Sequence, residues 1–589
     1  MADTQTGITI TDYASLEKFA AEPIAAWSKR NDQMKIWYRL IQMVDDLAKD
    51  GMESFVGNDP RSSFNLILHM LDTKIPHRIP NELLTPDIMA ASGEVETILS
   101  RAWTDVNLKH RRAGRQSWVR TFISYLLATG WYSAFAGISK DKTSCWAEVW
   151  NPATVYPDWD DQLWRCVHKF KISANAAKRA IATKGWQQVG DIRGATEVLD
   201  LWYLDDGGRV HNVIGMNKMI TKPDTVETLY RSWGIPIIVG PCGGLPDDGG
   251  ITGDTEAYRK EIGQSIVATN ASIYKSWNRW WTFSMQLLHD TAQPRWIEKS
   301  SSSRQILKPE DMFKRGAIFK MGLQDDIRPL DVPNIPVELR GAQLDMEAMM
   351  ERGGVSWAAQ GNFRGQLTSY VMAQVIASTA QVAKPFHHAT IDALSDIDNL
   401  WLTLIRETGA KPYDLSLPKG ITSNITASAN YEVQIPGDFI QRANAAKMIS
   451  AEFTLSNQFI MDTLFPEIPN PYREMAKVKS DRAQLDEVFL LIDKVKALRR
   501  EAEAMSGSRD TGDAQLFEKA AAAMEAKLTA MTGGGQAQPQ PQPGAAQGGM
   551  MGGGAAGGGM PGGAPAGQSL GPESPMGASS SELPPDVPR

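Results

Sequence analysis

A long apolar stripe in the middle of the chain does most to limit how this sequence can fold. Its members recur at spacings of three, four and seven residues, which places them on one face of a helix. They are Tyr258, Ile262, Ile266, Ile273, Trp277, Trp281, Met285 and Leu288. The opposite face is polar, and Asp254 is placed to cap the first turn. The pattern predicts a helix from near Asp254 to about residue 290, with one face buried in a core or against another subunit.

After this stripe, segments that are interrupted by proline or glycine alternate with segments that have a helical pattern. Residues 291–335 contain several prolines and short strand-like runs, and Val337–Arg352 has the periodicity of a second helix. The glycine-rich run ERGGVSWAAQGNFRGQL then leads into a long helix from Thr368 to about Thr408. Pro385 lies inside that helix and is expected to kink it.

The chain before the stripe begins with a helical region. Residues 12–110 are predicted to be helical, with breaks at 58–60 and 76–80. The run TFISYLLATGWYSAFAGIS, residues 121–139, carries no charge, but its two glycines and its hydroxyl groups argue against a membrane span of about 20 apolar residues. It predicts a buried helix that ends near Gly130, followed by a strand.

A β-rich region follows between residues 144 and 240. Five short runs in it are rich in β-branched or aromatic residues and are bounded by turn residues, so they predict strands. They are SCWAEVW, LWRCVHKFKI, ATEVLDLWYL, RVHNVIG and ETLYRSW. Residues 174–185 predict a helical insert that ends at a glycine.

The last part of the chain has three segments of different composition and predicted structure. Residues 410–436 predict a return through a strand and a loop, and residues 438–532 are helical with a break at 466–471. Residues 533–589 are dominated by Gly, Pro, Gln, Ala, Met and Ser, so they cannot bury enough apolar surface to fold and are expected to be disordered. The predicted fold class is mainly α with β-rich segments (α+β).

Charge and cysteine content narrow the function. The 589 residues carry a net charge of −7, which argues against a broad basic face that grips DNA but not against a protein that surrounds DNA loosely. Cys145, Cys166 and Cys242 have no CxxC spacing, so we expect neither a disulfide framework nor a zinc site, and a reducing compartment fits. The N-terminus carries acids where a signal peptide needs a basic segment, so none is expected.

The glycine-rich run does not match a nucleotide-binding loop. It lacks GxxxxGK[ST] and GxGxxG, and it follows a helix, whereas a dinucleotide-binding loop follows a strand. Two interpretations remain open. The run is either a flexible linker between helices, or an exposed loop whose Phe363 and Arg364 contact a partner.

One helix face carries residue types that ligate metals. His388, Asp392 and Asp396 recur every four residues, with His387 beside them. Ligands on successive turns of one helix can share an ion, but nothing nearby in the sequence completes the shell. We therefore expect a solvated or ion-paired face and no bound metal.

Two aspartate clusters are candidate sites, one for catalysis and one for calcium binding. Asp158, Asp160 and Asp161 lie in VYPDWDD, and paired carboxylates can act as an acid and a base, but such residues are ordinary in a turn. Asp247 and Asp248 lack the periodic acids of an EF-hand loop. Because GxSxG and HExxH are also absent, no catalytic residue and no cofactor is predicted.

Two further clusters could reach nucleic acid. Trp280 and Trp281, beside Lys275 and Arg279, could stack on bases, although a tryptophan on a helix stripe more often belongs to a core or a subunit contact. The basic cluster consists of Lys109, His110, Arg111, Arg112 and Arg115. A solvated face is the usual role of such a cluster, and contact with nucleic acid is the alternative.

The order of these elements resembles the portal proteins of tailed bacteriophages over residues 1 to about 530. LLATGWYSAFAGIS followed by VWNPATVYPDWDDQLWRCVHKFKIS is similar to the wing region of that family. RGAIFKMGLQDDIRPLDVP is similar to the clip segment between two stem helices. The polar tail is a departure, because it is no general feature of the family.

The resemblance implies a portal-like, ring-forming fold with a defined domain order. It assigns residues 1–110 to an N-terminal helical region, 111–250 to the wing, 251–290 to the first stem helix, 291–335 to the clip, 336–352 to the second stem helix, 353–367 to a tunnel loop, 368–437 to a long kinked helix and the return to the wing, 438–532 to a crown-like helical domain, and 533–589 to a disordered tail.

The resemblance also implies a function that is structural and not enzymatic. A homo-oligomeric ring, usually of twelve subunits, would sit at one capsid vertex of the virion after assembly in the host cytoplasm. Double-stranded DNA would pass through its channel during packaging and ejection. Terminase, a head–tail adaptor and the major capsid or scaffold proteins would be its partners, with no membrane involved.

Particular residues take roles under this resemblance. The tunnel loop would face DNA through Asn362, Phe363, Arg364 and Gln366; the channel side of the stem would carry Lys275 and Arg279; and the stem stripe contacting the next subunit would be Ile266, Ile273, Trp277 and Trp281. An acidic chain with few basic groups near the bore would let DNA pass without binding it tightly. Helix stripes would serve as interfaces in a cyclic, heterologous ring.

Two alternatives from other classes remain. One is a hydrolase-type or nucleotidyl-transfer enzyme with a pocket that joins Asp158, Asp160 or His388 to other polar groups. The other is a non-viral helical scaffold protein. Ring assembly separates the portal interpretation from both.

Overall fold

The computed structural model describes residues 10–48, 54–246, 259, 261–292, 296–300, 320–329, 337–355, 369–431, 460–461, 464–465, 471–484, 487–506 and 511–532, with short gaps at 74, 81–82, 84–85, 188–189, 191, 419, 423–424 and 430. The chain divides into two compact units, Met1–Asp481 and Arg482–Arg589. Both helices and sheets are present, which confirms the α+β fold class.

Among the described residues, five helices precede β2 (Trp131–Ile138), in the region that the sequence predicts to be helical. They are α1 (Tyr13–Ala26), α2 (Ser28–Ile41), α3 (Asp59–Leu71), α4 (Pro86–Arg112) and α5 (Trp118–Thr129). Asp12 begins α1 with a capping box in which its carboxylate accepts a hydrogen bond from the Ser15 backbone at 2.7 Å. A two-residue strand, β1 (His77–Arg78), lies in the predicted break between α3 and α4.

The junction after α5 explains why a glycine stands there. Gly130 has a φ of 71° and caps the helix in the left-handed conformation. A Cβ at this position would lie 2.4 Å from the backbone of Gln264, so no other residue fits. The chain continues directly into β2 (Trp131–Ile138), which confirms the predicted helix, glycine and strand.

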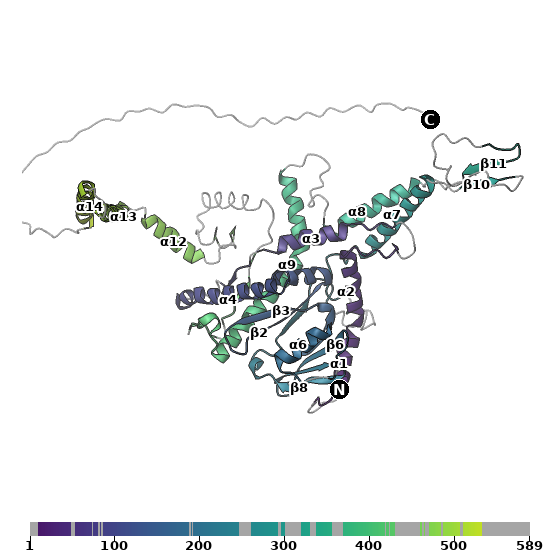
Figure 1. Cartoon of the computed structure of the whole chain (residues 1–589), viewed down its shortest axis with the longest axis horizontal. Helices are drawn as coiled ribbons and strands as arrows, with labels where there is room; N and C mark the ends of the chain where they lie inside the picture. Colours follow the sequence, from purple (N-terminus) through teal and green to yellow (C-terminus); the bar gives the residue numbers. More distant parts are fainter. Residues whose placement is uncertain are drawn as a thin grey trace, which may run out of the picture. The chain divides into compact units, whose positions relative to one another are not determined.

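Two antiparallel sheets follow in the first unit (Figure 1). The three-stranded sheet has the order β3-β2-β9, with β3 (Cys145–Val149) and β9 (Ile237–Pro241) on either side of β2. The five-stranded sheet has the order β4-β5-β6-β7-β8 and is formed by β4 (Val155–Trp159), β5 (Leu163–Ile172), β6 (Thr196–Leu204), β7 (Val210–Met216) and β8 (Met219–Val226). Its inner strands β5, β6 and β7 match three of the predicted runs.

Helices cover both faces of the five-stranded sheet. On one face, Leu16 and Ala20 of α1 pack against Leu199 and Leu201. On the other face, the helical insert α6 (Ala174–Lys184) packs through Ala177 against a separate apolar cluster. Alternate residues of a strand point to opposite faces, so one sheet supports two small cores.

One predicted strand is absent, and three observed strands of the two sheets were not predicted. ETLYRSW is not a strand, because Thr228–Tyr230 forms a short 3-10 turn that buries one aromatic ring, Tyr230. VYPDW and MITKPDTV were not predicted as strands, yet they form β4 and β8. Both contain a proline and both lie at an edge of the sheet, where a missing N–H donor breaks no ladder. Strand β9 was also missed.

The stem helix α7 (Ala271–Ala292) begins later than its stripe predicts. Residues 261–270 are not helical, and Asp254 lies outside the described residues. The Gln264 N–H donates to Cys242 O at 2.9 Å and the Ile266 N–H donates to Leu127 O at 3.0 Å. Tertiary hydrogen bonds to β9 and α5 therefore hold this segment in place of a helical ladder.

The helix predicted for Val337–Arg352 is present as α8 (Val337–Gly353), which lies beside α7 (Figure 1), and its role as a stem helix stays a prediction. Strands β10 (Trp296–Lys299) and β11 (Asp326–Pro329) form an antiparallel ribbon between the two helices in sequence. We call α7, this ribbon and α8 the stem hairpin. Residues 293–295, 301–319 and 330–335 of the proposed clip and 356–367 of the proposed tunnel loop lie outside the described part.

The long helix α9 (Ser369–Thr408) is confirmed and continues through Pro385. Its apolar face, which includes Leu394, Ile397 and Trp401, is buried in the main core. The indole of Trp401 donates to Trp146 O at 3.3 Å, which links α9 to β3. The chain then returns through a 3-10 turn, Pro412–Asp414, and β12 (Ser428–Ala429), which pairs with β1.

The C-terminal helices are α12 (Pro471–Gln484), α13 (Glu487–Ser506) and α14 (Thr511–Thr532). Helices α13 and α14 belong to the second unit and pack on each other around Leu491, Val495 and Ala521. The helical prediction for 438–532 is confirmed over these ranges, and the tail 533–589 is outside the described residues. No helix in the described part has an apolar stretch long enough to cross a membrane.

Candidate functional site

The proposed tunnel-loop residues cannot be placed relative to the rest. Asn362, Phe363, Arg364 and Gln366 lie within 356–368, outside the described residues. The backbone leading to the loop is anchored, because Val355 is buried and Met350 O accepts a hydrogen bond from Asn270 Nδ2 at 2.8 Å. Contact between this loop and DNA stays a prediction.

The two basic residues assigned to the channel side of the stem are both exposed on α7. Lys275 lies against α2, where it lines a depression of about 60 Å³ together with Arg39 and Asp46. Arg279 is one turn further along the same face. The structure of a single chain does not show whether Lys275 and Arg279 line a channel, so their role on the channel side of the stem stays a prediction.

The stem stripe packs inside its own chain at the base of α7. Trp277 is 7% exposed, and Ile266, Ile273 and Trp281 are half-buried against the same core. The ring of Trp281 lies 5.5 Å from that of Phe55. These side chains therefore stabilise the single subunit, and their contact with a neighbouring subunit remains a prediction.

The other end of the stem hairpin leaves large apolar side chains in water. Phe283 and Leu288 on α7 and Leu344 on α8 each expose more than half of their surface. Further exposed members of the hairpin are Met285, Trp296, Ile297, Met321, Leu323 and Met349. The base of the hairpin thus contributes buried side chains such as Trp277 and Met350 to the core, while exposed apolar side chains occur along both helices and between them.

The histidine and aspartate face of α9 does not form a metal centre. His388, Asp392 and Asp396 are exposed on one face, while His387 Nε2 lies 2.7 Å from Tyr431 O. Asp396 is accessible as a whole residue, but partial burial of its carboxylate and then the charge of Asp392 raise its pKa to about 6. Among the described residues, no three His, Cys, Asp or Glu side chains lie close enough together to hold an ion.

Asp158 serves a structural role that the sequence did not indicate. Its Oδ2 accepts hydrogen bonds from Arg165 Nε at 3.1 Å and Nη2 at 2.5 Å. Arg165 also donates to Glu22 at 2.7 Å and to the Phe19 carbonyl at 3.0 Å. The buried guanidinium therefore attaches α1 to the edge of the sheet, and the carboxylate that the enzyme alternative needs is already paired.

The remaining acidic candidates are not assembled into a site. Asp160 and Asp161 are exposed in the turn between β4 and β5. Asp247 and Asp248 lie outside the described residues. The three cysteines are buried and unpaired, and burial raises the pKa of Cys145 to about 12, so its reactive thiolate form is suppressed.

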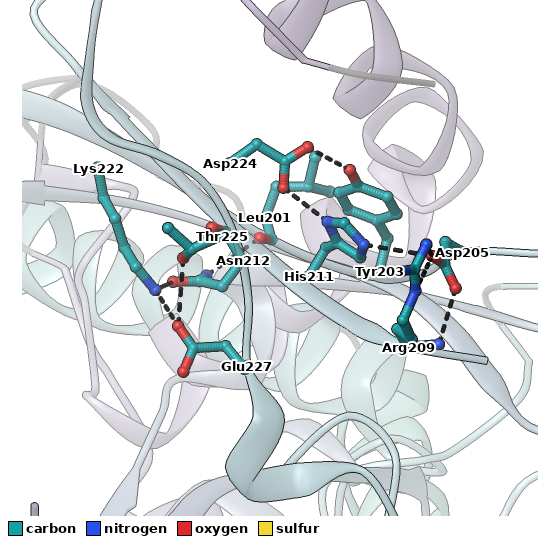
Figure 2. Close-up of polar contacts among 10 residues, drawn as sticks. All are labelled: Leu201, Tyr203, Asp205, Arg209, His211, Asn212, Lys222, Asp224, Thr225 and Glu227. Carbon is teal, nitrogen blue, oxygen red and sulfur yellow. Dashed lines mark hydrogen bonds and ion pairs between the residues drawn. The ribbon is translucent and has the colours of Figure 1, made fainter. Parts of the chain in front are cut away.

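A side-chain network that the sequence did not single out lies on β6, β7 and β8 (Figure 2). The Nδ1 atom of His211 is 2.8 Å from Asp224 Oδ1, and the Tyr203 hydroxyl donates to Asp224 Oδ2 at 2.5 Å. The Nε2 atom of His211 is 3.4 Å from Asp205 Oδ2. Asp224 therefore joins the Tyr203 hydroxyl and one ring nitrogen of His211, while the other ring nitrogen lies near Asp205 without a hydrogen bond to it.

Neighbouring groups set the charges in this network. Burial, followed by the hydrogen bond to Asp224, raises the pKa of Tyr203, so the phenol keeps its proton. Burial acts to raise the pKa of Asp205, but hydrogen bonds from Arg209 and Gly207 outweigh it and lower that pKa. Asp205 is therefore a stable anion at the β6–β7 turn.

A second polar group occupies the opposite face of the same strands. Asn212 donates to Asp200 Oδ1 at 2.7 Å and accepts from Lys222 Nζ at 2.5 Å, and Lys222 also pairs with Glu227. Burial raises the pKa of Asp200 to about 6, against the lowering effect of Asn212 and Lys222. These groups satisfy one another, so the network holds edge strand β8 in register and offers no exposed nucleophile.

The basic cluster at the end of α4 is largely unneutralised. Lys109 pairs with Asp105 at 2.8 Å, and His110 is buried. Arg111, Arg112 and Arg115 are exposed and form no ion pair with any described residue. The cluster is therefore a local excess of positive charge on an acidic chain.

Comparison with known proteins gives structural neighbours only. No protein-family model matches the chain, and no curated protein matches it. A chain from the neck of an empty gene transfer agent (GTA) particle, with C6 symmetry, is 14% identical over 69% of this chain and 90% of its own, with a TM-score of 0.38. A chain from the virion of a native GTA particle is 14% identical over 69% of this chain and 89% of its own, with a TM-score of 0.37. A chain from the neck of a native GTA particle, with C12 symmetry, is 13% identical over 69% of this chain and 99% of its own, with a TM-score of 0.33.

All three TM-scores are below 0.5, so these likenesses carry no weight for the function of this chain. Its function is inferred below from its own residues and elements.

Proposed function

We propose that this chain is the subunit of a portal-like ring at one vertex of a tailed-phage type capsid. The ring forms the channel through which double-stranded DNA is packaged and ejected. Terminase, a head–tail adaptor and the capsid or scaffold proteins dock on it. The subunit is a structural component of the virion and carries no catalytic site.

The stem hairpin supports this proposal most directly. Phe283, Leu288 and Leu344 are exposed on two helices whose bases are fixed in the subunit core. Large apolar groups gathered on one element mark an interaction surface, because water disfavours their exposure. A face of this kind on every copy suits a ring in which each hairpin packs against the next.

The charge of the chain agrees with a channel through which DNA moves. Each phosphate that a basic residue neutralises releases counterions and strengthens binding, which would resist translocation. A net charge of −7, with single basic residues such as Lys275 and Arg279 exposed on the stem, keeps such contacts few. The glycine-rich loop after α8 supplies the contact with DNA in this proposal, through Phe363 and Arg364.

Assembly of stem-hairpin variants tests the proposal. In the double variant Phe283→Ser, Leu344→Ser, loss of two large apolar groups should raise the concentration needed for assembly by roughly 10- to 100-fold. Met219→Ser is the matched control, because Met219 is equally exposed but lies on β8 of the sheet. Circular dichroism should show that both variants remain folded. Equal assembly of the double variant and the wild type would contradict the proposed interface.

A further inference from the structure

A hollow between three helices of the first unit has no role in ring assembly as proposed. It lies among α2, α3 and α5, which contact one another pairwise. Its walls include Tyr38 from α2, Arg61 and Phe64 from α3, Gln116 from the link before α5, and Tyr125 from α5. Polar and apolar groups thus converge on one hollow from separate segments, as in small-ligand sites.

The size of the hollow limits what can enter it. Its volume is about 240 Å³. A cavity of about 150 Å³ holds benzene, and drug-sized ligands occupy roughly 300–1,000 Å³. One aromatic ring with a short polar arm therefore fits, whereas a nucleotide does not.

The lining favours an aromatic ring at the base of the hollow. Ile41, Phe64 and Ala128 supply apolar surface, and Tyr38 and Tyr125 add two further rings. Aromatic rings pack favourably edge-to-face or offset at centroid separations of roughly 4.5–7 Å. The ligand therefore presents an apolar, planar body to this side.

The charge of the lining favours an anion. Arg61 is the one charged residue that lines the hollow, and it forms no ion pair with any described residue. Its guanidinium lies 5.7 Å from the Phe64 ring centroid, so the cation is held beside the apolar floor. Burial and then Tyr38 raise the pKa of Tyr125, while the charge of Arg115 lowers it, so Arg115 of the basic cluster is within electrostatic range of this lining residue.

We propose that this hollow is a binding site for an aromatic carboxylate. The ring packs among Tyr38, Phe64 and Tyr125, and the carboxylate pairs with the Arg61 guanidinium, whose planar fork of donors matches two carboxylate oxygens. Such a group arrives either as a free small acid or as the C-terminal aromatic residue of a peptide. The proposal concerns the single subunit and does not depend on ring assembly.

Calorimetric titration of the full-length protein tests the site with four probes. They are 3-phenylpropanoate, its neutral amide 3-phenylpropanamide, the peptide Gly-Gly-Phe with a free C-terminal carboxylate, and the same peptide amidated. We expect each acid to bind up to about five-fold more tightly than its amide, since an accessible ion pair contributes up to about 1 kcal/mol. Tighter binding of the peptide acid than of the free acid identifies a peptide as the source, and the reverse identifies a small acid.

Variants separate the site from general charge effects. Arg61→Gln should weaken binding of both acids about five-fold and leave the amides unchanged. Arg179→Gln is the matched control, because Arg179 is exposed on α6 and lines no part of the hollow. Equal binding of acids and amides, unchanged acid binding in Arg61→Gln, or no binding of any probe at millimolar concentration would overturn the proposal.

Discussion

His77 Nδ1 lies 2.6 Å from Asp398 Oδ2, which joins β1 to α9 through a carboxylate that is completely buried. The second oxygen of Asp398 accepts a hydrogen bond from the Trp103 indole on α4 at 2.8 Å. The ring of Trp103 also stacks on His77 at 5.2 Å. One carboxylate therefore fixes three segments that are far apart in the sequence, including the long helix that follows the proposed tunnel loop.

Removal of this carboxylate should destabilise the first unit strongly. Asp398→Ala leaves His77 and Trp103 without their partner in the core, and loss of one member of a buried pair costs about 3–5 kcal/mol. Thermal unfolding followed by tryptophan fluorescence measures the effect. Asp392→Ala is the control on the same helix, because Asp392 is exposed and should change stability by less than about 0.5 kcal/mol. Similar melting temperatures for the two variants would show that the buried carboxylate has no special role.

The two glycines that end α5 and α6 should respond differently to alanine. Gly130 and Gly185 have similar φ angles of 71° and 66°, so alanine at either position meets the left-handed strain of about 1–2 kcal/mol. A Cβ at Gly130 would also collide with the backbone of Gln264 at 2.4 Å, whereas nothing lies within 4 Å at Gly185. Chemical denaturation should therefore show a larger loss for Gly130→Ala. Equal losses would mean that the α5–β2 junction tolerates displacement of residues near 264.

Asp200 should make stability fall as pH rises. Its pKa is raised to about 6 in the folded chain, chiefly by burial, and lies near 3.9 in an unfolded one. Between these values only the folded state holds the proton, so raising the pH from about 4 to 6 removes on the order of 1–3 kcal/mol of stability, with no further loss above that range. Asp200→Asn keeps an oxygen that can accept from Asn212 and should abolish this dependence. Parallel pH profiles of the free energy of unfolding for both proteins would contradict the assignment.

Sequence patterns predicted the structure correctly where nearby residues, such as a glycine at a helix end, determine it. Gly130 and Gly185 end α5 and α6 because left-handed backbone at a helix terminus strongly favours glycine. The runs of β5, β6 and β7, which are rich in β-branched and aromatic residues and bounded by turn residues, form the inner strands of the sheet. In each case the signal comes from residues within a few positions of the element that they define.

Sequence patterns failed where distant contacts decide the structure. Ile262 and Ile266 continue the helical stripe of α7, yet their segment bonds to β9 and α5, and no local pattern records those partners. Pro223 argued against a strand at β8, so β8 was not predicted. The positions of Lys222 and Asp224 opposite β7 could therefore not be inferred. The His211 network depends on the pairing of three strands, so it could not be predicted without β8.

The mass of the assembled protein tests the central claim most directly. Light scattering coupled to size exclusion, together with negative-stain imaging, should be applied to the full chain over a range of concentrations. We expect a closed ring with a central hole and a mass near twelve times the 64.8 kDa of one chain. A species that remains at 64.8 kDa at every concentration, with no ring in the images, would contradict the claim that this chain forms a portal-like channel.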